Sequence, residues 1–340
     1  MSIVMTFGII ELFTVFLVAA NVFTFALFAL DKRRAIKNKW RISESCLILF
    51  TLAFGAIGAV FGMYLLRHKT TKTKFKVALT IGLAVVAIPL VHIAHALTLD
   101  RIVQYVEIDF NSENWPPQLD GYRIAFMTDM HVISDEAMAE VIGELNRRNI
   151  DLLLLGGDFS TRNSHYQGTV REISRAITTN GIFGVEGNHD DHIRLFAAME
   201  QYGMTPLDNS AMRIQPGFYV AGVQDMWNRT PDIAEAIRQT DSDAFILLVS
   251  HNPDVVMAQP TAGVDLMLSG HSHNGQITFF GWPFYLLRGS ITEYGTRFGH
   301  GFAESADGVP VFTSGGVGVY YSWPRIFNRP EVVIFTMHSE

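Results

Sequence analysis

The sequence contains a single cysteine, Cys46, so an intrachain disulfide is impossible and the chain is not a disulfide-stabilised scaffold. Lysine is absent after Lys76. Residues 100–340 hold 15 basic and 30 acidic residues, a net charge of −15, whereas residues 1–99 carry a net charge of +8. Because an acidic domain repels the phosphate backbone, we expect no nucleic-acid partner.

Charged residues are also nearly absent from three apolar stretches in the first hundred residues, and each stretch is about long enough to cross a bilayer. The N-terminus has neither a basic start nor a small-residue cleavage site, so no cleavable signal peptide is predicted. We predict a helical membrane domain over residues 1–99, a linker and first strand over 100–122, and a second domain over 123–340.

The middle apolar stretch, residues 46–66, has basic residues on both sides, which conflicts with the positive-inside rule for a segment that crosses the membrane. Gly55, Gly58 and Gly62 interrupt it. We favour a re-entrant helical hairpin that enters and leaves by the cytoplasmic face, since a crossing segment would leave one basic block on the wrong side. Two spans then remain, about 12–30 and 77–97, and residues 100–340 lie outside the cytoplasm.

From residue 123 onward, short apolar runs alternate with amphipathic segments and glycine-rich loops. Arg123–Thr128 and Asp151–Leu155 read as buried strands, and the helix predicted over Ser134–Asn149 lies between them. This alternation predicts an α/β domain whose sheets are covered by helices.

Five polar motifs stand at the ends of predicted strands, where open α/β sheets place ligands. They are Asp129-Met130-His131, Gly156-Gly157-Asp158, Gly187-Asn188-His189-Asp190, Ser250-His251-Asn252-Pro253 and Gly270-His271-Ser272-His273-Asn274. Carboxylate, imidazole and amide side chains without thiolate suit manganese, iron or zinc. The motifs therefore predict a site for two divalent metal ions and do not distinguish between these metals. Manganese is our first expectation, with zinc or iron as alternatives.

With these motifs in this order, residues 123–340 resemble a calcineurin-like metallophosphoesterase of the membrane-anchored bacterial branch; Gly315-Gly316-Val317-Gly318 also fits that branch. The resemblance implies a two-sheet αββα sandwich preceded by the helical membrane domain, and a dinuclear metal site. It assigns Asp129, His131 and His273 to the first metal, Asn188, His251 and His271 to the second, and Asp158 to both.

The same resemblance makes His189 the catalytic residue that contacts the phosphate or protonates the leaving group. Asp190 joins it as a candidate catalytic residue that orients a neighbouring ligand. Asn274 stands where relatives often carry glycine, and it is the candidate substrate-binding residue. Residues 20–80 separately resemble a small bacterial membrane domain of unknown function, through Asp31-Lys32-Arg33-Arg34-Ala35, Arg41-Ile42-Ser43-Glu44 and Arg67-His68-Lys69-Thr70.

These features predict an integral protein of the bacterial cell membrane whose extracytoplasmic domain hydrolyses a phosphate ester or diester of a lipid or lipid-linked substrate. Aromatic residues in 277–287 and 320–324 fit an acyl-chain groove, or equally a packed loop. One alternative is a cytoplasmic-facing UDP-diacylglucosamine pyrophosphatase. Another makes the acidic domain a metal-binding regulatory partner of a membrane transporter or sensor. The oligomeric state stays open.

Overall fold

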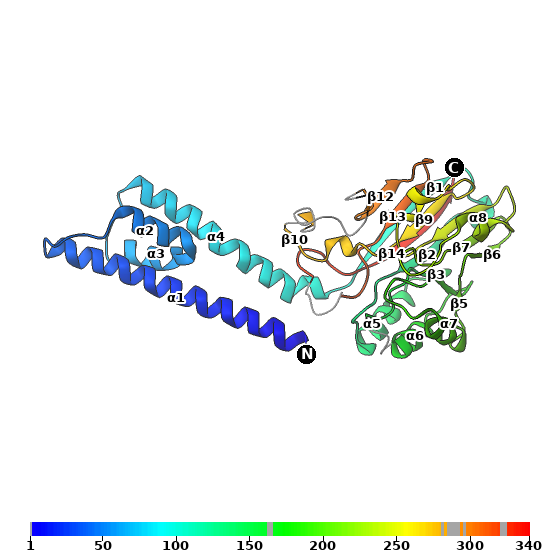
Figure 1. Cartoon of the computed structure of the whole chain (residues 1–340), viewed down its shortest axis with the longest axis horizontal. Coiled ribbons are helices and arrows are strands. Elements are labelled where there is room, and N and C mark those ends of the chain that lie inside the picture. Colours follow the sequence, from blue (N-terminus) through cyan, green and yellow to red (C-terminus); the bar gives the residue numbers. More distant parts are fainter. Residues whose placement is uncertain (1, 162–165, 280–281, 284–292, 295–296, 320–324) are drawn as a thin grey trace. The chain divides into compact units, whose positions relative to one another are not determined.

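The computed structural model describes residues 2–161, 166–279, 282–283, 293–294, 297–319 and 325–340 (Figure 1). The chain divides into two compact units, Met1–Leu97 and Thr98–Glu340. The first unit contains α1 (Ser2–Ile36), α2 (Glu44–Phe50), a π-helical turn η1 (Thr51–Gly55), α3 (Ala56–Tyr64) and α4 (Thr73–Leu97). Three of its stretches are long and apolar enough to cross a membrane: Leu12–Ile36, Glu44–Tyr64 and, extending to the start of the second unit, Thr73–Arg101.

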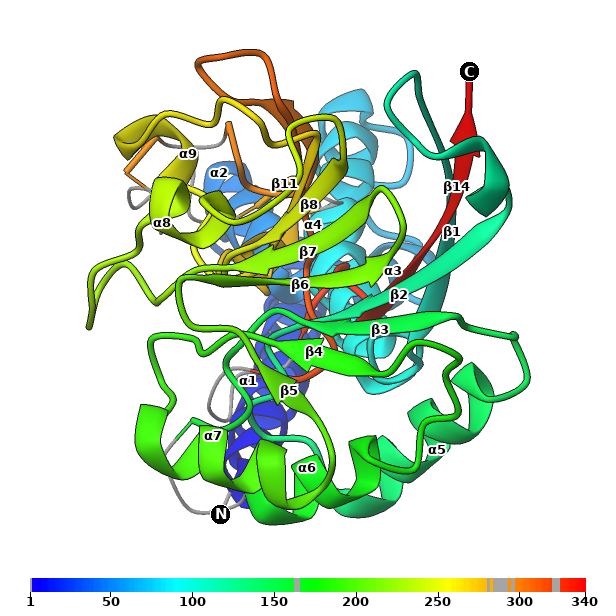
Figure 2. The ribbon, with the colours of Figure 1, turned by 90° about the vertical axis from the view of Figure 1, so that its right-hand side faces the viewer.

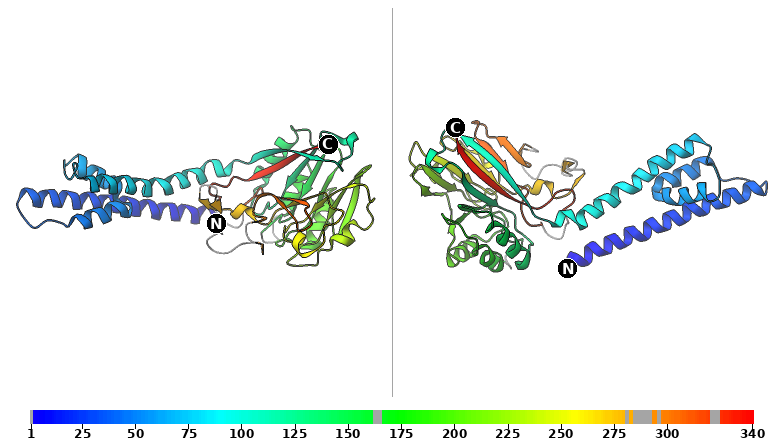
Figure 3. Two further views of the ribbon diagram at one scale, coloured as in Figure 1. Left: turned by 90° about the horizontal axis from the view of Figure 1, so that it is seen from above. Right: turned by 180° about the vertical axis from the view of Figure 1, so that it is seen from behind.

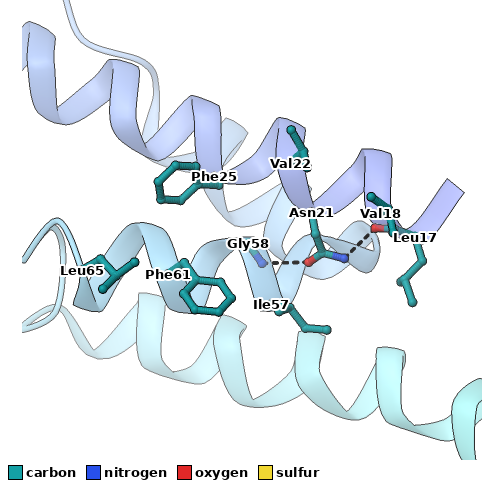
Figure 4. Close-up of a pocket in the computed structure, with 9 residues that line it drawn as sticks. All are labelled: Leu17, Val18, Asn21, Val22, Phe25, Ile57, Gly58, Phe61 and Leu65. Atoms are coloured by element: carbon teal, nitrogen blue, oxygen red, sulfur yellow. Dashed lines mark hydrogen bonds between the residues drawn. The ribbon is translucent and has the colours of Figure 1, made fainter. Parts of the chain in front are cut away.

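The middle stretch of the first unit is broken between α2 and α3. Ala53 and Phe54 leave helical geometry, and Phe54 has a φ of +64°. Asn21 on α1 satisfies backbone groups at this break. Its Nδ2 donates to the Phe54 carbonyl at 2.9 Å. Its Oδ1 accepts from Gly58 N at 2.8 Å, a contact drawn in Figure 4. Because an unsatisfied backbone group in a bilayer costs several kcal/mol, one polar side chain allows the chain to turn there.

Both ends of the broken segment meet one buried residue of α1, Asp31. Its Oδ1 accepts from Ile42 N at 3.1 Å, and its Oδ2 lies 2.7 Å from His68 Nε2. Arg41 donates to both oxygens of the same carboxylate. The segment therefore leaves and returns at one end of α1, the geometry of a helical hairpin. Asp31, Arg41 and His68, one from each of the three charged motifs of this region, meet at that end.

The second unit begins with a short 3₁₀ turn, η2 (Leu99–Arg101), and contains two six-stranded sheets. The first sheet has the order β1 (Gln104–Ser112), β14 (Glu331–Ser339), β2 (Tyr122–Met127), β3 (Leu152–Leu155), β4 (Ile182–Gly184), β5 (Thr205–Pro206). The second has the order β12 (Gly301–Glu304), β13 (Pro310–Thr313), β9 (Leu266–Ser269), β8 (Phe245–Val249), β7 (Phe218–Gly222), β6 (Ser210–Gln215). A small hairpin pairs β10 (Thr278–Phe279) with β11 (Trp282–Pro283).

Helices cover the outer faces of both sheets, as the ribbon in Figure 2 shows. They are α5 (Asp135–Leu145), α6 (Tyr166–Ile173) and α7 (His192–Gln201) on the first sheet, and α8 (Ile233–Ile237) and α9 (Val255–Ala258) on the second. Short 3₁₀ turns lie at η3 (Pro117–Leu119) and η4 (His273–Gly275). The predicted two-sheet αββα fold is confirmed.

The strands of the first sheet alternate between two cores. In β2, Ala125 and Met127 face the helices, whereas Ile124 and Phe126 face the second sheet. Both faces are buried, so the strands read as continuous apolar runs. The first strand, β1, pairs with β14 along its whole length, as Figure 3 also shows. Residues 104–112 are therefore part of the first sheet.

Candidate metal centre

The polar motifs follow strands whose carboxyl ends point to one edge of the sandwich. β2 runs parallel to β3, and β8 runs parallel to β9. Five of the candidate ligands have a positive φ: Asp129 (+54°), His131 (+38°), Asp158 (+54°), His271 (+68°) and His273 (+52°). Such backbone conformations cost about 1–3 kcal/mol each in non-glycine residues and cluster at functional sites. Turning these side chains toward the site therefore lowers the folding stability of the chain.

Four buried residues form a first cluster, in which one ligand atom from each lies within 4.8 Å of the others: Asp129, His131, Asp158 and His273. His131 Nε2 and His273 Nε2 are 3.0 Å apart. Asp129 Oδ1 lies 3.2 Å from His273 Nε2. The cluster therefore converges oxygen and nitrogen donors on one point.

A second cluster adjoins the first and contains Asn188, His251 and His271. Asn188 Oδ1 lies 3.1 Å from His251 Nε2 and 2.9 Å from His271 Nδ1. Asp158 Oδ2 is shared, because it lies 3.3 Å from His251 Nε2 and 3.3 Å from His131 Nε2. One carboxylate oxygen thus stands between two sets of donors, and all seven predicted metal-ligating residues are brought together.

These donors fit a dinuclear site for divalent metal ions. Within the described part of the chain, Asp129 Oδ1 is buried and accepts no hydrogen bond. A bound cation would interact favourably with the imidazole nitrogens that face one another. It would also satisfy the carboxylate oxygen that accepts no hydrogen bond. The donor set of carboxylate, imidazole and amide, without sulfur, suits manganese, zinc or iron.

The electrostatics of the histidines agree with this role. Burial lowers the pKa of His131 to about 4 and that of His271 to about 3, so both rings are neutral and keep a lone pair at neutral pH. Burial also lowers the pKa of His273 well below its usual value. Although burial acts in the same direction on His251, the neighbouring Asp158 carboxylate raises the pKa of that ring to about 10. Cationic charge is thus favoured beside Asp158.

Residues around the clusters hold the donors in place. Asp129 Oδ2 accepts from Thr128 Oγ1 at 2.9 Å and from His271 N at 3.0 Å. His251 Nδ1 donates to the Gly156 carbonyl at 2.8 Å, which fixes the ring with Nε2 directed at Asp158. A Cβ at Gly187 would lie 2.2 Å from Asp158 Oδ1, so glycine is required for the close approach of these two loops.

The predicted catalytic pair, His189 and Asp190, occupies different positions. The His189 ring is partly exposed, and its centroid lies 5.5 Å from that of His131. The Asp190 carboxylate accepts from Gly187 N and Phe159 N, each at 2.9 Å. Asp190 therefore joins the loops that carry Asp158 and Asn188, as expected for a residue that orients neighbouring ligands. Asn274 is partly exposed next to His273 and has a φ of +48°.

Sequence reasoning missed two residues beside the clusters. The Trp227 side chain is 59 % exposed, and its ring meets the His271 ring edge-on at 4.6 Å. Arg325 is fully buried and donates to the carbonyls of Gly315, Gly316 and Gly318. The glycine motif also contacts the first cluster directly, since Gly318 N donates to the Asp129 carbonyl at 2.9 Å. The only sequence signal for Arg325 was that motif, and Trp227 had none.

The aromatic segment after the last motif is described in part. Phe279 and Trp282 are exposed in the β10–β11 hairpin, at 53 % and 72 %. Phe280, Phe284 and Tyr285, together with Tyr320, Tyr321 and Trp323, lie outside the described residues. An acyl-chain groove built from the whole segment stays a prediction.

Parts of the chain are similar in sequence to two protein families and to proteins named as metallophosphoesterases. Residues 122–275 match the calcineurin-like phosphoesterase family, and residues 21–75 match a family of unknown function, DUF1294. An uncharacterized metallophosphoesterase of Helicobacter pylori is 27% identical, over 63% of this chain and 58% of its own length. This chain thus spans little more than half of that relative.

Two further relatives differ in how much of them is matched. The uncharacterized metallophosphoesterase YkoQ of Bacillus subtilis is 24% identical over 76% of this chain and 98% of its own length. A transmembrane protein with metallophosphoesterase domain from Danio rerio is 22% identical over 67% of this chain and 55% of its own length.

Proposed function

We propose that this chain, which carries a calcineurin-like phosphoesterase domain, is a membrane-bound enzyme that hydrolyses a phosphate ester or diester of a lipid or lipid-linked alcohol. The observation that carries the proposal is the shared Asp158 oxygen, 3.3 Å from a histidine of each cluster. Manganese is the proposed metal, and the same donors accommodate zinc or iron.

The residues divide the work of hydrolysis. Two divalent ions bound there would offset the charge of the phosphate and lower the pKa of a coordinated water toward neutrality. Asp129, His131 and His273 would hold one ion, Asn188, His251 and His271 the other, and Asp158 both. His189, partly exposed beside His131, would donate the proton that the leaving alcohol needs, and Asn274 would contact the phosphate oxygens. Such proton donation contributes a factor of roughly 10² to 10⁴ in rate.

An apolar substrate is supported by an exposed aromatic residue beside the second cluster. Trp227 presents an exposed indole beside His271, and its loop is held because Asp225 Oδ2 accepts from Trp227 N at 3.0 Å and from Asn228 N at 2.8 Å. Asn228 in turn donates to the Asn188 carbonyl at 2.7 Å. A fixed aromatic wall beside a phosphate site favours an alcohol with an apolar body. The same chain also has three helices that are long and apolar enough to anchor it in a bilayer.

Trp227→Ala is expected to change substrate preference. With the full chain in phosphatidylcholine vesicles, kcat/KM should fall roughly tenfold for a long-chain alkyl phosphodiester, since about 1–3 kcal/mol of apolar contact is lost. The value for a methyl phosphodiester should stay within about twofold, and Trp227→Phe should recover most of the loss. An equal fall for both esters would refute the apolar wall, and wild-type protein that cleaves neither ester would refute the hydrolase.

Membrane orientation is predicted from the hairpin geometry. Ile42 and His68 both contact Asp31, so the basic blocks on either side of 46–66 lie at one end of the helical unit. Basic loops stay in the cytoplasm. Reporters at Lys37 and Lys72 are therefore expected to score inside, and reporters at Met1 and Glu340 outside. A cytoplasmic Glu340 would instead favour a nucleotide-linked lipid such as UDP-diacylglucosamine as substrate.

A further inference from the structure

Asp100 lies directly after the last apolar helix, in the turn η2, and its carboxylate is buried. Both of its oxygens are used. Oδ2 accepts from Phe327 N at 2.8 Å, and Oδ1 accepts from Asn328 N at 3.1 Å. A residue at the membrane exit thus binds two successive backbone amides more than 220 residues further along the chain.

The Asn328 side chain connects this turn to the metal centre. Its Nδ2 donates to the His273 carbonyl at 2.6 Å, and more distantly to the Asn274 carbonyl at 3.4 Å. Its Oδ1 accepts from Asn274 Nδ2 at 3.4 Å. Asn328 is itself buried. One amide therefore holds the backbone of a candidate first-metal ligand and the side chain of the candidate phosphate contact.

The turn needs support because its backbone is strained. Phe327 has a φ of +51°, a conformation that bulky side chains rarely adopt. The Phe327 carbonyl accepts from Thr278 Oγ1 at 2.8 Å, and Ile326 N donates to the Gln276 carbonyl at 3.1 Å. The turn is thus joined at several points to the loop that carries His273, and its two successive amides donate to Asp100.

We propose that Asp100 is a positioning residue for the metal centre: it fixes the turn at Phe327 and Asn328, through which Asn328 holds the ligand His273. The segment that follows the last apolar helix then helps to hold the metal centre, in addition to linking the two units of the chain. Only a carboxylate offers an acceptor oxygen to each amide, because an asparagine would turn an NH₂ group toward one of them. This inference rests on the proposed dinuclear metal centre.

The test measures manganese binding to the full chain in detergent, by elemental analysis after dialysis against buffered Mn²⁺. In a His251→Ala background, which leaves the cluster of Asp129, His131 and His273, adding Asp100→Ala should weaken Mn²⁺ binding roughly 10- to 100-fold, as loss of outer-sphere support does. In a His273→Ala background, which leaves the other cluster, Asp100→Ala should change binding less than about twofold.

Matched variants separate positioning from folding. Asn328→Ala should reproduce the loss at the first cluster, and Asp100→Ala with Asn328→Ala together should lose no more than the larger single loss, because the two act through one contact. Asp100→Asn should lose less than Asp100→Ala, and it carries the test if Asp100→Ala does not accumulate. Asp109→Asn, at an exposed carboxylate on β1, is the control and should bind as wild type.

Two results would overturn the proposal. One is normal Mn²⁺ binding by Asp100→Ala at the first cluster, even with a lowered melting temperature, since Asp100 would then serve stability alone. The other is an equal loss at both clusters. Failure of the wild type to bind two Mn²⁺ ions would instead contradict the proposed function, so the two ideas fail separately.

Discussion

Asp158→Ala is expected to release both metal ions and to lower turnover by on the order of 10³ or more. The reason is the position of Asp158 Oδ2, 3.3 Å from His131 Nε2 and from His251 Nε2, so that one substitution removes a donor from each cluster. Metal ions contribute several kcal/mol to stabilising the charge of such a transition state, and every 1.36 kcal/mol is a factor of ten in rate.

The measurement is metal content per chain by elemental analysis, with turnover of a chromogenic phosphodiester in parallel. Exhaustive chelation of the wild type should bring its rate to the same residual level. Added Mn²⁺ should then restore the wild type and leave Asp158→Ala inactive. The control is Asp243→Ala, at an exposed carboxylate just before the amino end of β8, the end of that strand opposite to the one that carries His251. Wild-type activity that survives confirmed metal removal would contradict the dinuclear assignment.

Substitutions of two neighbouring residues in one motif, Asn188 and His189, are expected to have different effects on metal binding and turnover. Asn188 Oδ1 lies among His251 and His271, so Asn188→Ala should lower metal occupancy and rate together. The His189 ring is partly exposed beside His131 and is not one of the proposed ligands, so His189→Ala should keep two metals. Its turnover should still fall by roughly 10² or more, as expected when a proton donor is lost.

The leaving group provides the sharper comparison for His189. A p-nitrophenyl ester releases a weakly basic alcohol that needs no proton, whereas an alkyl phosphodiester does need one. The loss in His189→Ala should therefore be much smaller for the first substrate than for the second. If His189→Ala lost metal as Asn188→Ala does, or lost the same factor on both substrates, the proton-donor role would be wrong.

The candidate site could be predicted from the sequence because its signals are local. Each motif directly follows a short apolar run, and a residue at the carboxyl end of a buried strand lies at the sheet edge wherever that strand sits. The runs that became β2, β3 and β8 were recognisable for the same reason. β6 and β12 were not, because their residues are half exposed and lack a continuous apolar pattern.

Only the tertiary structure determined the contacts between residues far apart in the chain. Asn21 bonds to both sides of a helix break more than 30 residues later, Asp31 joins the two ends of the hairpin, and Asp100 binds Phe327 and Asn328. No periodicity links such pairs, because a polar side chain takes whichever partner the packing of the apolar elements brings to it. Hydrophobic patterning determined which segments became strands and helices, and only their packing determined which buried polar groups would meet.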